Sequence, residues 1–297
     1  MKLNVKDSDI YVPDGISLEK ALDRTTHLGV GAHPDDLEVL AFHGIIACYV
    51  NPDFWFTGVT CTNGSGSPRQ GAYAGVSDKE MIKIRREEQR EASRLGKYSS
   101  MLQLGYQSSA IKSSNANSLV NDLEKILAEA RPQILYTHNP LDKHATHTAV
   151  CLAVLKAVRL LPVSLRPEKI LGCEVWRDLD WLPEKHKVVL DVGGHRELES
   201  SLLSAFKSQI AGGKRYDLAV SGRRLAQATF LDTHRPDRLE SAIYALDLTP
   251  LVAEKAFELK TFIENILEEF RKSVEKQLEN LTGLLSSPQK KGNNVKG

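Results

Sequence analysis

Short apolar runs alternate along the chain with longer segments in which apolar residues recur at helical spacing. The run at 27–32 (HLGVGA) ends abruptly in the turn residues His33-Pro-Asp-Asp36. Residues 37–50 follow with apolar positions at helical spacing, and 54–60 (FWFTGVT) form the next apolar run. Strand, turn, helix and strand in this order are typical of a parallel βαβ unit.

The rest of the chain repeats this alternation. The pattern predicts helices over 80–95, 119–130, 145–161, 197–209 and 216–228, and strands over 101–104, 133–137, 170–176 and 188–192. Residues 1–26 are polar and are expected to wrap the edge of the domain irregularly, and the glycine-rich segment 61–77 is expected to form a lid-like loop. We therefore expect an α/β fold with a Rossmann-like, mostly parallel sheet, helices on both faces and a long C-terminal helix.

The last segment has its own pattern. Between 251 and 285 the apolar residues recur mostly at steps of three and four, which predicts an amphipathic helix that packs on the domain or on a partner subunit. The expected organisation is one α/β domain over 1–250, this helix over 251–285, and a disordered tail over 286–297.

The composition limits which classes of binding partner and which cellular location we expect. The 297 residues carry a formal net charge of +1, which leaves no electrostatic footprint for nucleic acid or an anionic membrane. The N-terminus lacks a secretory signal pattern, and no apolar run is long enough for a membrane span, so we expect a cytoplasmic protein. The four cysteines are far apart and are expected to be buried free thiols.

Candidate chemistry begins at the end of the first predicted strand. Ligands of open parallel sheets bind at the carboxyl ends of the strands, and His33, Asp35 and Asp36 lie at such an end. His33 and Asp36 are three residues apart and can share one cation. Asp35 then points elsewhere and is free to move a proton.

A second polar cluster follows the predicted strand 133–137. His144 and His147 are three residues apart on a predicted first helical turn and face one side. One neutral imidazole of this pair would complete a site of three ligands, which is typical of catalytic zinc. Either cluster taken alone has an ordinary structural explanation, such as a helix cap or surface histidines.

The two motifs, GAHPDDLE and DKHATHTAV, resemble those of the LmbE/PIG-L family of zinc-dependent N-deacetylases. Residues 32–36 and Glu38 match the family motif A-H-P-D-D-x-E, and His144 and His147 match its H-x-x-H motif, although Ala145 and Thr146 replace the usual Pro-Asp. The resemblance covers about residues 27–160.

The resemblance implies that His33, Asp36 and His147 bind zinc (Zn2+), that Asp35 is the general base, and that His144 acts near the leaving group, in part as a protonated imidazole. Iron(II) suits similar nitrogen and oxygen ligands, so Fe2+ is a second candidate metal.

Four further residues are candidates for supporting or substrate contacts. Asp142 is expected either to orient the imidazole of His144 or to cap the helix that follows. Glu38 completes the first motif, and His138 ends a predicted strand. Arg85 belongs to a charged helix whose residues are usually a solvated face, although one arginine there could contact substrate.

The expected activity is removal of an acyl group, an acetyl group above all, from the amide nitrogen of an N-acetylglucosamine-type sugar or conjugate. An amidase of a thiol conjugate or of another small linear amide would use the same site. A non-catalytic metal-binding protein is the alternative from another class, and the spare carboxylate of Asp35 disfavours it, because structural zinc is normally closed by four ligands. The expected partners are a small-molecule substrate and further copies of the chain in a homo-oligomer.

Overall fold

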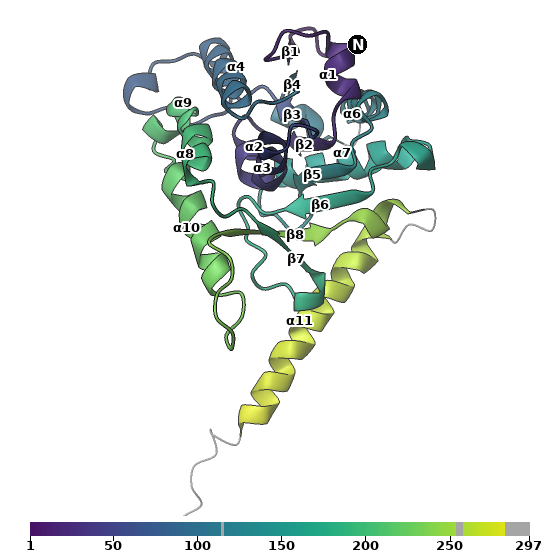
Figure 1. Ribbon diagram of the computed structural model, residues 1–297, viewed down its shortest axis with the longest axis vertical. Coiled ribbons are helices and arrows are strands. Elements are labelled where there is room, and N and C mark those ends of the chain that lie inside the picture. Colours follow the sequence, from purple (N-terminus) through teal and green to yellow (C-terminus); the bar gives the residue numbers. More distant parts are fainter. Residues whose placement is uncertain (114–115, 254–257, 283–297) are drawn as a thin grey trace, which may run out of the picture.

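The computed structural model describes residues 1–113, 116–253 and 258–282. Its centre is an eight-stranded sheet in the order β1-β4-β3-β2-β5-β6-β8-β7 (Figure 1). The strands are β1 (Asp9–Tyr11), β2 (His27–Gly31), β3 (Phe56–Thr62), β4 (Ser100–Tyr106), β5 (Ile134–His138), β6 (Lys169–Cys173), β7 (Lys187–Asp191) and β8 (Ala242–Asp247). The central strands β4, β3, β2, β5 and β6 are parallel, whereas β1 and β8 pair antiparallel with their neighbours.

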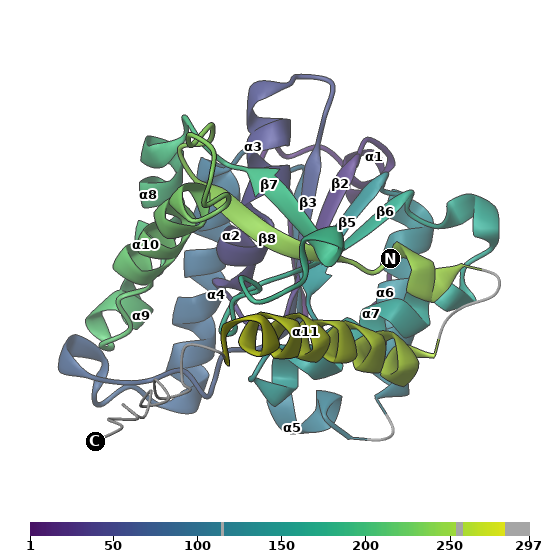
Figure 2. The same ribbon diagram turned by 90° about the horizontal axis from the view of Figure 1, so that it is seen from below.

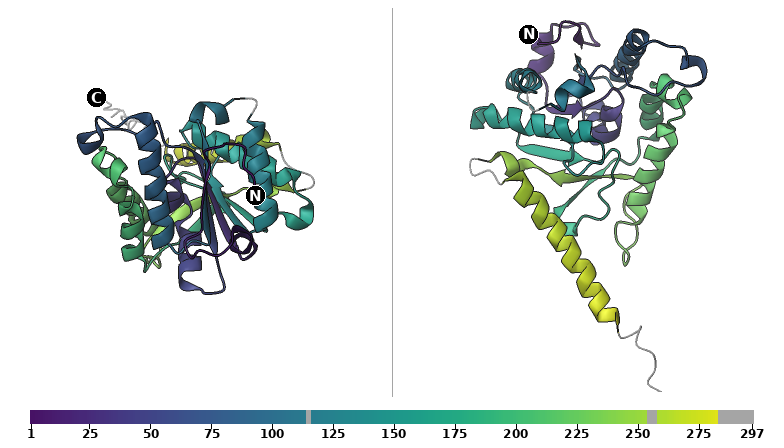
Figure 3. Two further views of the ribbon diagram at one scale, coloured as in Figure 1. Left: turned by 90° about the horizontal axis from the view of Figure 1, so that it is seen from above. Right: turned by 180° about the vertical axis from the view of Figure 1, so that it is seen from behind.

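Helices cover both faces of this sheet (Figures 2 and 3). They are α1 (Leu18–Asp23), α2 (Asp36–Leu40), α3 (Phe42–Val50), α4 (Asp78–Leu95), α5 (Ser108–Ile111), α6 (Asn117–Ala130), α7 (Ala145–Leu160), α8 (Arg196–Ser204), α9 (Lys207–Ala211), α10 (Tyr216–Thr229) and α11 (Leu259–Leu281). Short 3-10 turns lie at η1 (Gly71–Tyr73), η2 (Val163–Leu165), η3 (Glu184–His186) and η4 (Thr249–Val252). The α/β fold predicted from the sequence is confirmed.

Each face of the sheet has its own apolar core, because successive residues of a strand point to opposite sides. Leu28 and Val30 of β2 pack with α6 and α7 in one cluster, and Phe56 of β3 packs with α2 and α3 in the other. The strands are buried along nearly their whole length, which is why they appear in the sequence as continuous apolar runs.

Two glycines let α2 approach the sheet closely. A Cβ added at Gly29 would lie 3.0 Å from a Leu37 methyl group, and one added at Gly58 would lie 2.9 Å from the other methyl group of Leu37. A larger residue at either position would push α2 outward. The glycines of β2 and β3 therefore fix the position of the turn 32–36 that precedes α2.

The chain reverses its direction of winding between β2 and β5. From β2 the sheet continues through β3 and β4 on one side and through β5 and β6 on the other. Such a switch point leaves a crevice at the carboxyl ends of the two adjacent strands, where open α/β sheets bind ligands. The end of β2 and the end of β5 carry the two motifs, so the topology brings them together.

Several local predictions were wrong. Residues 1–26 are not irregular, because β1 adds an edge strand to β4 and α1 begins at the Ser17 N-cap. The strand β8 was not predicted, and the predicted helices over 37–50 and 197–209 are each broken in two, at Ala41 and at 205–206. β1 has only three residues, so its pairing partner, and not a sequence pattern, defines it.

The C-terminal helix begins later than predicted. Residues 249–252 form a 3-10 turn, α11 begins at Leu259, and only Ile266 of α11 is buried. Figures 1 and 3 show α11 extending away from the sheet. The predicted disordered tail 286–297 lies outside the described residues. Across the parts of the chain that the structure describes, no helix combines the length and apolar character needed to cross a membrane.

Candidate metal centre

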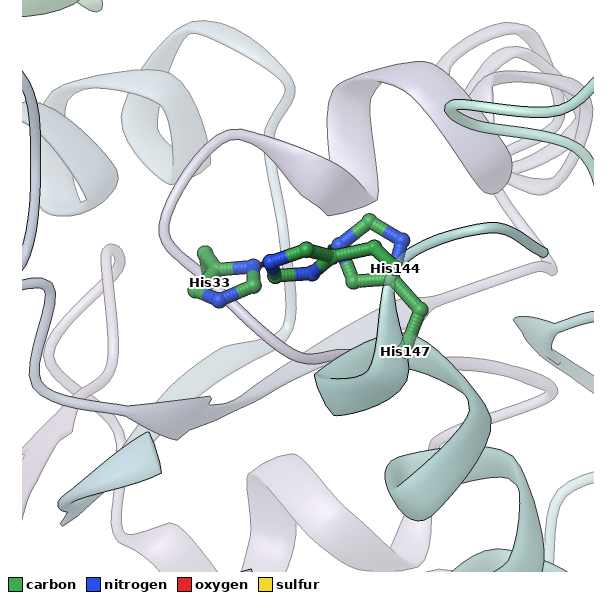
Figure 4. A group of neighbouring side chains, drawn as sticks. All are labelled: His33, His144 and His147. Atoms are coloured by element: carbon green, nitrogen blue, oxygen red, sulfur yellow. Dashed lines mark hydrogen bonds between the residues drawn. The ribbon is translucent and has the colours of Figure 1, made fainter. Parts of the chain in front are cut away.

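Two neighbouring strand ends supply the polar residues of this centre. β2 leads into the turn that carries His33, and β5 ends at His138 and leads to α7, for which His144 is the N-cap residue and His147 lies in the first turn. Figure 4 shows the imidazoles of His33, His144 and His147 gathered at one place. The ring centroids of His33 and His147 are 5.1 Å apart.

Three donor atoms form a nearly regular triangle. Asp36 Oδ2 lies 3.1 Å from His33 Nδ1 and 3.5 Å from His147 Nε2, and the two imidazole nitrogens are 3.2 Å apart. A tetrahedral zinc ion with bonds of about 2.0–2.1 Å requires ligand atoms about 3.3 Å apart. The triangle thus fits one face of a zinc coordination tetrahedron and leaves the fourth corner open.

Other groupings of the same residues are less suitable. His33, His144 and His147 lie within ligand distance of one another, as do Asp36, His138 and His147. However, His138 Nε2 already accepts a hydrogen bond from the Ala32 N–H (2.9 Å), so its lone pair is engaged. His138 is fully buried behind Asp36 and His147, and its ring stacks on His147 with centroids 3.9 Å apart.

The charges around the triangle favour a cation. Burial raises the pKa of Asp36, but the imidazoles of His147, His138 and His33 outweigh burial and hold it well below its usual range. Burial lowers the pKa of His147, but the carboxylates of Asp36 and Asp142 outweigh burial and raise it. Positive charge is therefore stabilised between these groups.

Asp142 fixes the orientation of His147. Its Oδ2 accepts hydrogen bonds from His147 Nδ1 (3.2 Å) and from the Trp176 N–H (3.1 Å), and its Oδ1 accepts from the His144 N–H (3.0 Å). Because Nδ1 donates to a carboxylate, Nε2 of His147 faces the triangle. Of the two roles expected for Asp142, orientation of the His144 imidazole is wrong, since only the backbone N–H of His144 donates to its side chain. The helix cap is wrong as well, because His144 is the N-cap residue of α7.

Asp35 lies beside the triangle in a strained conformation. Its φ is +96°, a region that residues other than glycine rarely adopt and that commonly marks functional sites. Its N–H donates to Gln89 Oε1 (3.1 Å), and its Oδ2 accepts from Arg85 Nη2 (2.6 Å). Burial raises the pKa of Asp35 to about 6, although the Arg85 guanidinium opposes this shift.

Arg85 is not on a solvated face. Its side chain is 1% exposed, and it donates to the Pro34 carbonyl as well as to the Asp35 and Glu88 carboxylates. The charge pattern of α4 suggested solvation because Arg86, Glu87 and other residues of the outer face hide the buried stripe. Arg85 and Gln89, one helical turn apart, both hold Asp35; Gln89 was missed in the sequence.

Glu38 is linked to Asp35 through Gln89. Its Oε1 accepts from Gln89 Nε2 (2.8 Å) and from Tyr98 OH (2.8 Å), and burial raises its pKa to about 7. Glu38 is completely buried and is not among the residues that line the cleft, so it contacts Gln89 and not the cleft itself.

His144 reaches the open side of the site. It is exposed and lies near both other imidazoles, with its centroid 5.0 Å from that of His33 and 4.6 Å from that of His147. Its imidazole is nevertheless partly desolvated, and this partial burial, followed by the influence of His147 and His33, lowers its pKa to about 4. The protonated His144 that the resemblance implied stays a prediction.

A cleft of about 370 Å³ opens above these residues. His33, Asp35, Asp36 and Arg85 form part of its lining, together with residues of the glycine-rich loop and of α10. Trp176 and Tyr216 stand in its wall, with ring centroids 5.9 Å apart. Its volume falls in the range of small-molecule sites, roughly 300–1,000 Å³.

Comparison with known families agrees with this geometry. A sequence model of the family described as PIG-L, GlcNAc-PI de-N-acetylase, matches residues 28–158. The matched stretch runs from β2 to α7 and contains every residue of the triangle, together with Asp35 and His144. No curated protein sequence matches the chain.

Solved structures share the fold. N,N'-diacetylchitobiose deacetylase from Pyrococcus horikoshii is 17% identical, with a TM-score of 0.58 over 78% of this chain and 88% of that one. A conserved protein from Thermus thermophilus is 18% identical, with a TM-score of 0.58 over 76% and 95%. The 4-carboxy-2-hydroxymuconate hydratase of Pseudomonas putida is 15% identical, with a TM-score of 0.57 over 78% and 100%. The hydratase shows that this fold also supports another reaction, so the function has to be argued from the site.

Proposed function

We propose that this protein is a metal-dependent amidohydrolase, with zinc as its metal, that removes the acetyl group from an N-acetylglucosamine-type sugar or conjugate. The observation that carries the proposal is the Asp35 carboxylate, which is not part of the three-donor triangle and lies next to it where the triangle opens into a cleft. A purely structural zinc site would be closed by a fourth protein ligand. The match of residues 28–158 to the PIG-L family model supports deacetylation over other hydrolytic reactions.

In this proposal His33 Nδ1, Asp36 Oδ2 and His147 Nε2 hold the metal. Zinc in such a site would supply Lewis acidity, which lowers the pKa of water towards neutrality and polarises the acyl oxygen. Fe2+ suits the same nitrogen and oxygen donors, so metal analysis has to decide between the two.

Asp35 moves the proton. Arg85 holds its Oδ2, and Oδ1 has no hydrogen-bond partner among the described residues, so Oδ1 is free to accept a proton from the attacking water. The water oxygen bonds to the acyl carbon, and the carbon–nitrogen bond then breaks. Asp35 returns its proton to the departing nitrogen, and the products are acetate and the free amine.

His144 acts on the acyl oxygen. Its imidazole lines the open side of the cleft and can donate an N–H to this oxygen as negative charge develops there. An amidase of a thiol conjugate would use the same residues, because the geometry selects an amide and not the group attached to its nitrogen. A homo-oligomer and a cytoplasmic location stay predictions from the sequence.

The test combines metal content with acetate release. Purified wild type, Asp35→Asn and His33→Ala are analysed for bound metal and assayed on N-acetylglucosamine and its conjugates. We expect about one metal ion per wild-type chain, retained metal with turnover about 10²- to 10⁴-fold lower in Asp35→Asn, and lost metal in His33→Ala. Asp53→Asn, at an exposed aspartate, is the matched control and should behave as wild type.

Each result has a definite meaning. Full activity in Asp35→Asn would remove Asp35 as the base. Wild-type protein that takes up no metal even after reconstitution would refute the proposed function as a whole.

A further inference from the structure

Three cationic side chains line the cleft away from the donor triangle. Lys112 follows α5, Lys214 lies between α9 and α10, and Arg223 is on α10; all three belong to the cleft lining. Among the described residues of that lining, the only carboxylates are Asp35 and Asp36, and both already interact with Arg85 or with histidines. The wall therefore carries positive charge that the cleft itself does not neutralise.

Lys214 and Arg223 contact two adjacent residues of one segment, Trp176 and Val175. The ammonium of Lys214 lies 5.2 Å from the centroid of the Trp176 ring, within the range of a cation–π contact. Arg223 Nη1 donates a hydrogen bond to the carbonyl of Val175. Both cations are thus anchored in place and are only partly exposed, which lowers the entropy lost when they bind a ligand.

Neither cation forms an ion pair with any residue that the structure describes. Burial raises the pKa of the Glu174 carboxyl group, and the nearby Arg223 guanidinium opposes this shift. Yet the Glu174 oxygens accept from Gln227 Nε2, the Tyr244 N–H and the Leu179 N–H, and not from Arg223. The guanidinium keeps N–H groups that can donate to a ligand.

The same segment is tied to the candidate metal centre. The Trp176 N–H donates to Asp142 Oδ2, which also accepts from His147 Nδ1. The Asp142 carboxylate therefore connects Trp176, which Lys214 contacts, to the His147 imidazole of the donor triangle. A ligand held at Lys214 and Arg223 would be placed in a fixed relation to the reacting amide.

We propose that Lys214 and Arg223 bind a carboxylate or phosphate group of the substrate, with Trp176 as the apolar wall between this group and the floor of the cleft. The preferred substrate is then an acidic N-acetyl amino sugar or acidic conjugate, and these two residues determine that specificity. This inference rests on the proposed deacetylase function. The planar guanidinium of Arg223 suits two oxygens of an oxyanion, and Lys214 adds a second, more flexible charge.

The test compares a neutral probe with acidic probes. Acetate release from N-acetylglucosamine, N-acetylglucosamine 6-phosphate and N-acetylmuramic acid is measured at low and high ionic strength; the last two probes separate phosphate from carboxylate. We expect wild type to prefer at least one acidic probe by about tenfold or more in kcat/KM, and this preference to shrink with salt.

Substitutions then assign the preference. We expect Lys214→Gln and Arg223→Gln each to reduce the ratio of acidic to neutral kcat/KM by roughly 10- to 100-fold, mainly through KM, because each removes charge-assisted hydrogen bonds. Arg223→Lys should recover part of the loss. Lys207→Gln, on the exposed side of α9 and outside the cleft, removes the same charge and should keep the ratio of wild type.

A binding measurement separates this inference from the proposed function. If metal-loaded wild type releases acetate from none of the probes, the deacetylase proposal fails, and calorimetry with glucosamine 6-phosphate against glucosamine still tests the subsite. Tighter binding of the phosphate that is lost in Arg223→Gln and kept in Lys207→Gln would support it. Equal kcat/KM or equal affinity for acidic and neutral probes would overturn the inference. A preference for acidic probes that both Lys214→Gln and Arg223→Gln retain would also overturn it.

Discussion

Replacement of Asp142 by asparagine is a direct probe of how the fold prepares the metal centre. In the native arrangement the two carboxylate oxygens accept three N–H groups, from the His147 ring, Trp176 and His144, at 3.0–3.2 Å. The amide that replaces this carboxylate has a single oxygen. In either orientation its NH2 group therefore faces an N–H donor, and the negative charge that stabilises the His147 ring is gone.

The size of the effect follows from this contact. Loss of a carboxylate that orients a metal-binding histidine usually weakens metal affinity by about 10- to 100-fold. That factor corresponds to about 1.4–2.8 kcal/mol of binding free energy. His147→Ala, which removes the donor itself, should weaken binding much further and gives the lower limit of affinity.

The assay is competitive zinc titration against a chromophoric chelator at constant pH, with thermal unfolding followed in parallel. Asp178→Asn, at an exposed aspartate, is the matched control. We expect Asp142→Asn to stay folded and to regain most turnover when the zinc concentration is raised about 100-fold. Unchanged zinc affinity in a folded Asp142→Asn protein would show that His147 needs no carboxylate to orient it, or is not a ligand.

Three other predictions concern stability and assembly. Arg85→Met leaves two buried carboxylates without their cation, so we expect the free energy of unfolding to fall by about 3–5 kcal/mol in urea titrations, and a change below about 1 kcal/mol would contradict the buried network. The pKa of Glu38 rises from 4.5 in the unfolded chain to about 7, so its stabilising contribution is present below pH 4.5 and is lost as the pH rises towards 7. As the pH rises from about 4.5 to 8, the free energy of unfolding of Glu38→Gln should therefore increase relative to that of wild type by up to about 3 kcal/mol. Glu129→Gln, at the surface, should show no such increase. Finally, the exposed Leu267, Phe270, Val274 and Leu278 of α11 lead us to expect self-association through this helix; sedimentation should show an oligomer that Leu278→Glu weakens, and a wild-type monomer at micromolar concentration would argue against it.

Much of the parallel sheet was readable from the sequence because its strands are buried on both faces. Continuous apolar runs such as 27–32 are unusual outside such strands, and the long periodic segments such as α4 and α7 left little doubt about their type. The edge strands carried no such signal. β1 has three residues, and β8 is defined by antiparallel pairing with β6 and β7, which the local pattern does not contain.

The candidate site divides in the same way. The identities of His33, Asp35, Asp36, His144 and His147, and their place at strand ends, follow from local sequence. Their meeting point depends on β2 and β5 being neighbours in the sheet, which alternation of elements along the chain does not specify and the tertiary structure decided. The structure then places the donor atoms within 3.5 Å of one another.

Only the tertiary structure decided which residues support and surround that site. Asp142 contacts the ring of His147 and not that of His144, Arg85 is buried and not solvated, and Arg223 reaches the cleft from α10, far along the chain. Spacing along the chain is repeated by every helix, so it reports which residues share a face but not what that face meets. The meeting of faces is set by the packing of α4 and α10 against the sheet, and burial, charge pairing and access to the cleft follow from that packing.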